Sequence, residues 1–192
     1  MKKLILSIGL LVGATFTYGQ TEWTIDKSHS SVGFAVTHLV ISEVEGQFND
    51  FDAKVVSTSD DFAGSTVEFT AKAASIDTDN EQRDTHLKSD DFFNAEKFPE
   101  VKFNGKIVKN GAKYQLVGKF TMRDVTKDVT FDVKYNGTIK DPWGNIKSGF
   151  KVTGTVNRKE YGLKWGALTE AGGAVVSDEV EIAVNVELQK KG

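Results

Sequence analysis

The sequence contains no cysteine, and among its 192 residues there are only two prolines and three histidines. Without cysteine the chain has no disulfides, no thiolate ligands for zinc and no cysteine nucleophile. A lipid anchor on an N-terminal cysteine is excluded for the same reason. The histidines His29, His38 and His86 show no H-E-x-x-H spacing, so we expect no metal site.

Basic residues are also fewer than acidic ones. The chain has 27 acidic residues against 24 basic ones, which gives a formal net charge of −3. Binding to nucleic acid requires clustered Lys and Arg to neutralise phosphates. An acidic chain of this kind argues against a nucleic-acid partner.

Catalytic motifs are missing as well. There is no G-x-S-x-G nucleophile elbow, and the glycine-bearing segment 169–179 lacks the lysine of a P-loop. The acidic pairs Asp60–Asp61 and Asp90–Asp91 lie in polar connections, where carboxylates are normally solvated. The sequence therefore predicts no catalytic residues.

The longest apolar run, residues 4–16, follows Lys2 and Lys3 and precedes small and polar residues. This layout is typical of a secretory signal peptide, and the run is shorter than the roughly 20 residues that span a bilayer. We expect residues 1–19 to be a signal peptide, with a retained anchor helix as the alternative. Residues 20–192 would then form a single domain that is periplasmic or secreted, with no stable membrane anchor.

What the sequence does contain is apolar–polar alternation with a period of two residues. It is clearest over 180–188, 128–135 and 101–107, and similar runs occur at 67–73, 114–122 and 146–156. Such strands bury one face and expose the other, which is typical of antiparallel sheets. In the strand after Val44 the alternation slips by one residue at Asn49–Asp50, which predicts a β-bulge.

Residues 77–99 depart from this pattern. Asp79 or Asn80 is suited to cap a short helix that runs through Leu87, and Pro99 ends any helix. Phe92 and Phe93 follow in what would otherwise be a polar connection. We expect this segment to pack over an open end of the sheet, with the two phenylalanines as part of a lid.

About eight strands with one short helical segment form either a sandwich or a closed barrel. The short hairpin connections favour an all-β, antiparallel up-and-down barrel. Barrels of about eight strands are either filled by side chains or hold one small ligand. Small residues in or beside the inward-facing rows favour an internal hydrophobic channel; they are Gly33, Ala71, Ala73, Gly105, Gly118 and Gly154.

His38 ends an apolar row formed by Val32, Phe34 and Val36. One interpretation is a structural histidine, hydrogen-bonded to the backbone or to a carboxylate. The other is a ligand contact, because the end of a strand in a hollow barrel lies near its mouth. The sequence leaves both open.

Four long stretches of the chain resemble the YceI-like family of exported lipid-binding proteins, also called the polyisoprenoid-binding family. They are "WTIDKSHSSVGFAVTHLVISEVEGQFNDF" (23–51), "RDTHLKSDDFFNAEKFPEVKF" (83–103), "GKFTMRDVTKDVTFDV" (118–133) and "DPWGNIKSGFKVTGTVNRKEYGL" (141–163). The resemblance implies a lipocalin-like barrel that binds isoprenoid chains, isoprenoid quinones or related amphiphiles, and that often forms a homodimer. It implies no catalytic residues and no cofactor other than the bound lipid.

The expected function is therefore that of a carrier or storage protein for a long-chain isoprenoid or amphiphilic lipid. The predicted ligand-binding residues are Phe34, Val36, His38, Phe69, Phe92, Phe93, Phe103, Phe120, Phe131 and Phe150. Two alternatives remain. One is an enzyme that acts on a lipid-like substrate with His38 and Asp26 as an acid–base pair, and the other is a solid barrel that binds a protein.

Overall fold

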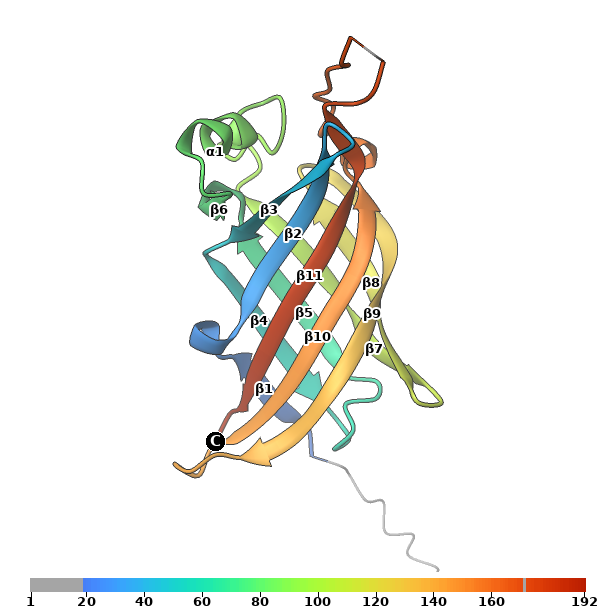
Figure 1. The fold of residues 1–192 in the computed structure, drawn as a ribbon. Helices are drawn as coiled ribbons and strands as arrows, with labels where there is room; N and C mark the ends of the chain where they lie inside the picture. The colour runs from blue at the N-terminus through green and yellow to red at the C-terminus, as the bar shows by residue number, and fades with distance from the viewer. Residues whose placement is uncertain (1–18, 171) are drawn as a thin grey trace, which may run out of the picture.

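The computed structural model describes residues 19–170 and 172–192, so the predicted signal peptide lies almost entirely outside the described residues. Eight antiparallel strands close into a barrel (Figure 1). Around the ring they are β1 (Thr21–Ile25), β4 (Phe51–Ser57), β5 (Thr66–Lys72), β7 (Glu100–Asn110), β8 (Lys113–Met122), β9 (Val125–Lys140), β10 (Ile146–Asn157) and β11 (Val176–Lys190). The predicted all-β, lipocalin-like barrel is confirmed.

The strands form where the sequence alternates, because each one buries the same face along its length. In β7, Val101, Phe103 and Ile107 are buried, while Lys102 and Asn104 between them are exposed. A strand places successive side chains on opposite faces, so this pattern directs every second residue into the barrel.

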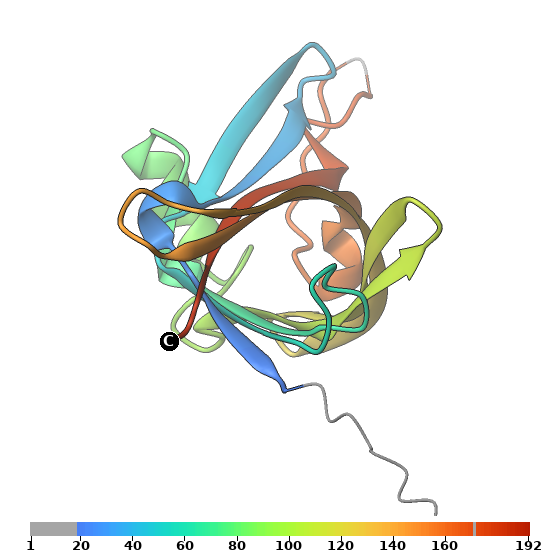
Figure 2. The ribbon, with the colours of Figure 1, turned by 90° about the horizontal axis from the view of Figure 1, so that it is seen from below.

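The barrel closes on β11, which changes neighbours along its length. Its last residues pair with β1, where Ile25 is opposite Leu188, and residues 176–185 pair with β2 (Ser31–His38). β2 continues the sheet outward through β3 (Ser42–Phe48) to the short β6 (Ile76–Asp77). Seen along the barrel, the β2–β3 hairpin leans away from the ring (Figure 2).

The predicted β-bulge at Asn49–Asp50 is wrong. The chain bends there, so that β3 ends at Phe48 and β4 begins at Phe51. The two strands then have different partners, since β3 pairs with β2 and β6 whereas β4 pairs with β1 and β5. The slip in alternation therefore marks a corner between two parts of the sheet, and both flanking phenylalanines are buried.

The predicted helix is confirmed as α1 (Glu81–Lys88), and the Asn80 side chain accepts a hydrogen bond from the Arg83 amide as its N-cap. Three short 3-10 helices complete the fold: η1 (Lys27–His29), η2 (Ala73–Ser75) and η3 (Arg158–Tyr161). Helix α1 lies at the upper end of the barrel in Figure 1, next to β6. We call this the mouth end.

The opposite end is closed by aromatic packing. Phe62, in the connection between β4 and β5, is 1% exposed. Its ring centroid lies 4.9 Å from that of Trp23, 5.0 Å from that of Phe150 and 5.7 Å from that of Tyr135. The Trp23 indole N–H donates to the Ser57 hydroxyl at 3.0 Å, which satisfies its only polar atom. We call this the plugged end.

Candidate ligand-binding site

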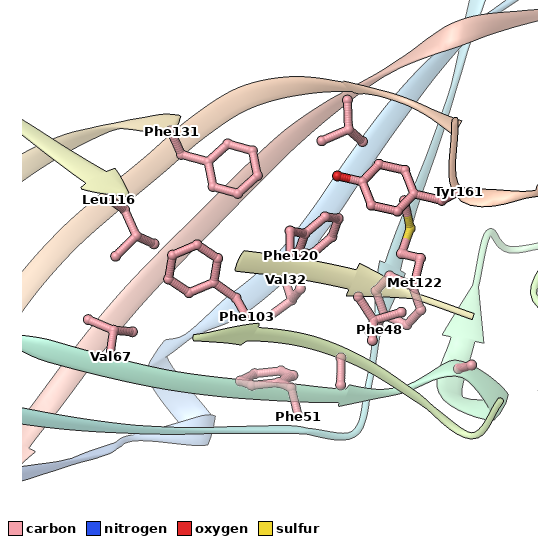
Figure 3. Packing of buried hydrophobic residues seen from close by; sticks show 14 of the residues in the cluster. Val32, Phe48, Phe51, Val67, Phe103, Leu116, Phe120, Met122, Phe131 and Tyr161 are labelled. Atoms are coloured by element: carbon pink, nitrogen blue, oxygen red, sulfur yellow. The ribbon is translucent and has the colours of Figure 1, made fainter. Parts of the chain in front are cut away.

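The interior of the barrel contains an apolar cavity of about 130 Å³, which we call the inner cavity. Every residue that lines it is aliphatic, aromatic or glycine. The lining includes six of the predicted ligand-binding residues, Phe34, Phe69, Phe103, Phe120, Phe131 and Phe150. Figure 3 shows Phe103, Phe120 and Phe131 directed toward one another inside the barrel.

Gly105 and Gly154 do not leave this space open, contrary to our expectation, whereas Gly33 and Ala71 line the cavity. A Cβ on Gly105 would lie 2.6 Å from the tip of the Phe103 ring, and one on Gly154 would collide with the Phe131 ring. These two glycines are required because phenylalanine rings from other positions fill their places, and at Gly105 the Val117 carbonyl oxygen lies closer still. The inner cavity is what remains after the rings are packed, which makes it narrow.

A second cavity of about 470 Å³ opens at the mouth end, and we call it the mouth cavity. It shares five lining residues with the inner cavity: Phe34, Phe48, Val101, Phe120 and Ile182. The two cavities therefore adjoin along one wall. Of the other predicted residues, Val36, His38, Phe92 and Phe93 line the mouth cavity. The interior is hollow, so the solid-barrel alternative does not describe this fold.

Polar groups gather at the mouth cavity, unlike the inner one. From α1 and the residues before it come Thr78, Asn80, Gln82, Arg83 and His86. The Arg83 guanidinium donates to the Thr78 hydroxyl at 2.8 Å and to the Thr78 carbonyl at 2.6 Å. The Asp84 carboxylate accepts from the Thr78 hydroxyl at 2.6 Å. This network holds α1 at the rim.

Arg158 lies on the other side of the mouth cavity and is 3% exposed. Its guanidinium donates to the carbonyls of Leu163 at 2.9 Å, Trp165 at 2.6 Å and Ser177 at 2.8 Å. Burial lowers the pKa of Arg158 from its ordinary value. Because these carbonyls belong to separate segments, Arg158 fixes the backbone that forms this side of the rim.

His38 lies at the rim with its ring in the wall of the mouth cavity. Within residues 19–170 and 172–192, no side chain or backbone group is hydrogen-bonded to its imidazole, and only its carbonyl accepts, from Ser42 and Ile41. The hydrogen bond that the structural interpretation of His38 expects is therefore not formed within the described residues. Contact with a ligand stays a prediction, as it does for the other lining residues.

The proposed acid–base pair of His38 and Asp26 is not formed. The two residues lie at opposite ends of β2, whose eight residues span about 26 Å. Asp26 instead accepts from Lys147 at 2.6 Å and from the Ser28 hydroxyl at 2.6 Å. These hydrogen bonds, chiefly that from Lys147, hold the pKa of the Asp26 carboxyl well below its usual range. Asp26 therefore belongs to a structural cluster outside the cavities.

That cluster brings together ligand atoms of Asp26, His29 and Glu187 within 4.8 Å of one another. The Lys147 ammonium lies 2.6 Å from the Asp26 carboxylate and 3.2 Å from that of Glu187. The lysine therefore supplies the positive charge that a metal ion would otherwise bring. The cluster joins β10, β11 and η1 where β11 changes partner.

Sequence reasoning missed several residues of the mouth. His86 and Trp165 pack edge to face at 5.4 Å between ring centroids, and both line the mouth cavity with Arg83 and Arg158. No periodic signal marks them, because they lie in a helix or in connections. Phe48 could have been found, since it ends the inward series Val44, Gly46, Phe48.

A closed antiparallel barrel with an apolar interior and one polar-rimmed opening is the architecture of a binding protein for hydrophobic molecules. Comparison with known proteins shows the family. The model of the YceI-like domain matches residues 23–188. A UPF0312 protein from Staphylococcus aureus (strain USA300) is 38% identical over 168 residues, which cover 87% of this chain and 96% of the relative. The chain belongs to the YceI-like family.

Solved structures show the same fold. The YCEI protein of Campylobacter jejuni superposes with a TM-score of 0.70 at 33% identity, covering 88% of this chain and 98% of that one. A polyisoprenoid binding domain from Saccharophagus degradans gives a TM-score of 0.63 at 12% identity, with the same coverage. In the part of the chain that the structure describes, no helix has the length and hydrophobicity needed to cross a membrane.

Proposed function

We propose that the protein binds one long apolar molecule, such as an isoprenoid chain or an isoprenoid quinone, and acts as an exported carrier or storage protein. The observation that carries the proposal is the inner cavity, which is lined without a single polar side chain and adjoins a polar mouth. The name of the Saccharophagus degradans neighbour, a polyisoprenoid binding domain, supports the same ligand class.

In this proposal the apolar chain fills the mouth cavity and extends into the inner cavity, because about 130 Å³ holds only part of a long chain, and the polar end of the ligand stays at the rim, near His38 and Arg83. Burying each CH₂ group contributes about 0.8 kcal/mol, so about twenty buried carbons offer roughly 16 kcal/mol before the losses of chain and rigid-body entropy. Tight binding then needs few polar contacts.

Export to the periplasm also belongs to the proposal, and its support is the sequence of residues 1–19 alone. Mass spectrometry of the mature N-terminus in the periplasmic fraction tests it. An intact residue 1 in the cytoplasmic fraction would contradict export.

The test of ligand binding is native mass spectrometry of the protein from its own cell envelope, followed by extraction and identification of any added mass. Val152→Trp should abolish loading, because Val152 lines the inner cavity and the larger ring fills it. The matched control is Lys151→Trp, one residue earlier on β10 and exposed. A Val152→Trp variant that loads like the wild type would overturn the proposal.

A further inference from the structure

Four aliphatic side chains project from the mouth end into solvent. Leu39 is 39% exposed, Val40 70% and Ile41 86%, all in the β2–β3 turn, and Leu168 is 74% exposed in the connection before β11. The two segments are joined by a hydrogen bond from the Leu39 amide to the Val175 carbonyl at 2.9 Å. Both rise above the barrel at the top of Figure 1. We call these four residues the apolar tip.

The backbone of the apolar tip is strained. Leu39 has φ 50° and Val40 has φ 66°, the left-handed conformation that hairpin turns of this kind normally assign to Asn and Gly. A β-branched residue there is an outlier, because its side chain crowds the backbone. Aliphatic residues at these two positions weaken the fold and expose apolar surface, which points to a role outside folding.

The two segments of the apolar tip differ in charge from other connections at both ends of the barrel, such as the β8–β9 turn with Arg123 and Asp124 at the mouth end. Residues 37–42 and 165–169, which include the apolar tip, contain no Lys, Arg, Asp or Glu, and the exposed residues Glu43, Lys164 and Glu170 lie directly beside them. Connections at the plugged end do carry charge: Asp60 and Asp61 lie in one, Lys109 and Lys113 flank another, and Lys140 and Asp141 begin a third. An uncharged aliphatic surface is complementary to the hydrocarbon of a bilayer, where a charged side chain is costly.

The apolar tip is continuous with the mouth cavity. His38 and Val175, which flank it on the two segments, both line that cavity, and His38 pairs with Val176. Any external surface that buries the apolar tip therefore lies directly against the opening of the mouth cavity, through which a ligand enters.

We infer that the apolar tip inserts into the outer part of a lipid bilayer and thereby seats the mouth of the barrel on the membrane surface. The binding is reversible and shallow, because the tip has only four aliphatic side chains. It draws on burial of apolar surface and not on charge, since the protein is acidic. The docking surface exists whether or not the cavity is loaded.

The absence of cysteine allows a direct test. Ile41→Cys carrying an environment-sensitive dye should change emission when vesicles of phosphatidylcholine and phosphatidylethanolamine are added. The same dye on Trp143→Cys, which is 85% exposed at the plugged end, should not respond. Added salt should leave the response unchanged, whereas attraction between charges would be screened.

The decisive variant is Leu39→Asn with Val40→Gly, measured by vesicle flotation. It supplies the residues that the turn prefers, so the barrel should be at least as stable as the wild type, while partition to vesicles should fall at least about tenfold. The matched control removes apolar surface elsewhere, through Ile139→Asn with Trp143→Ser, which are 67% and 85% exposed, and should float like the wild type.

Three outcomes overturn the inference. The wild type does not float with vesicles, the tip variant floats as well as the wild type, or the wild type is a dimer that binds no vesicles and that the tip substitutions dissociate. The last would show that a second copy of the chain covers the tip. Val152→Trp separates this inference from the proposed function, because it should float normally while failing to load. If the wild type carries lipid but does not float, only the docking inference fails.

Discussion

At the plugged end Phe62 is 1% exposed and its ring lies within 5.0 Å of those of Trp23 and Phe150, whereas at the mouth end Phe92 and Phe93 border a cavity of about 470 Å³. Both ends are rich in aromatic rings. They differ in what surrounds the rings, because Phe62 meets other aromatic rings while Phe92 meets the Arg158 guanidinium as well as the rings of His86 and Trp165. Hydrogen bonds from Arg83 and Arg158 to backbone carbonyls fix the segments that surround the mouth cavity.

The largest expected effect is at the plugged end. Phe62→Ala should lower the free energy of unfolding by about 3–5 kcal/mol, because a fully buried ring is lost and the left-handed backbone of Phe62 loses the packing that supports it. Denaturant unfolding measures the change. The exposed apolar residue Leu168 provides the control, and Leu168→Ala should stay within about 0.5 kcal/mol. A loss of under about 1 kcal/mol for Phe62→Ala would show that the plug is dispensable.

The next largest loss of stability is expected at the mouth end, where a buried charged residue, Arg158, stabilises the fold. Arg158→Met should cost about 2–4 kcal/mol, because the carbonyls of Leu163, Trp165 and Ser177 lose a charged donor. It should also weaken ligand binding, which Phe62→Ala need not do. The exposed neighbour Lys159, replaced by Met, should cost at most about 1 kcal/mol. Unchanged stability of Arg158→Met would remove the argument that polar contacts build the mouth.

An intermediate effect on stability is expected where β11 changes partner and Asp26 pairs with Lys147. Asp26→Asn should lower stability by about 1–3 kcal/mol near pH 7. The pKa of Asp26 is depressed in the folded state, so its contribution is present above the ordinary carboxyl pKa and is lost as pH falls toward the folded value. The difference between wild type and variant should therefore shrink below about pH 4.

The control for this pH dependence is Asp128→Asn, whose carboxylate pairs with Lys119 on the surface and is 84% exposed. It should change stability by at most about 1 kcal/mol at any pH. A difference between wild type and Asp26→Asn that grows in acid would contradict the assignment of the pKa shift to the folded state.

The smallest effect is expected at His38, on the rim of the mouth. His38→Ala should leave stability within about 0.5 kcal/mol, since the imidazole makes no hydrogen bond within the described residues. It should weaken binding of a lipid with a polar head about three- to tenfold, and leave a plain hydrocarbon unaffected. Titration with both ligands measures the two affinities. An equal loss of affinity for both would show that His38 contributes to the shape of the cavity wall and does not contact a polar head group.

Much of the fold was predictable from local pattern. The alternation in 101–107 and 180–188 assigned each residue to the inner or outer face, and the capping residue Asn80 marked the start of α1. The inward phenylalanines were identified for the same reason, and all ten predicted ligand-binding residues line one of the two cavities. The corner at Asn49–Asp50 was detected but misread, because a slip of one residue has the same appearance in a bulge and in a bend between strands.

By itself the sequence determined that the chain forms antiparallel strands, which residues face inward and where the helix starts, because these depend on neighbours within a few positions. Only the tertiary structure decided that the Phe131 ring occupies the space beside Gly154, that Asp26 pairs with Lys147 and lies far from His38, and that one end is plugged and the other open. Alternation assigns a side chain to the inner or outer face of the sheet. The groups that the side chain contacts across the barrel depend on which strands pair to close the barrel.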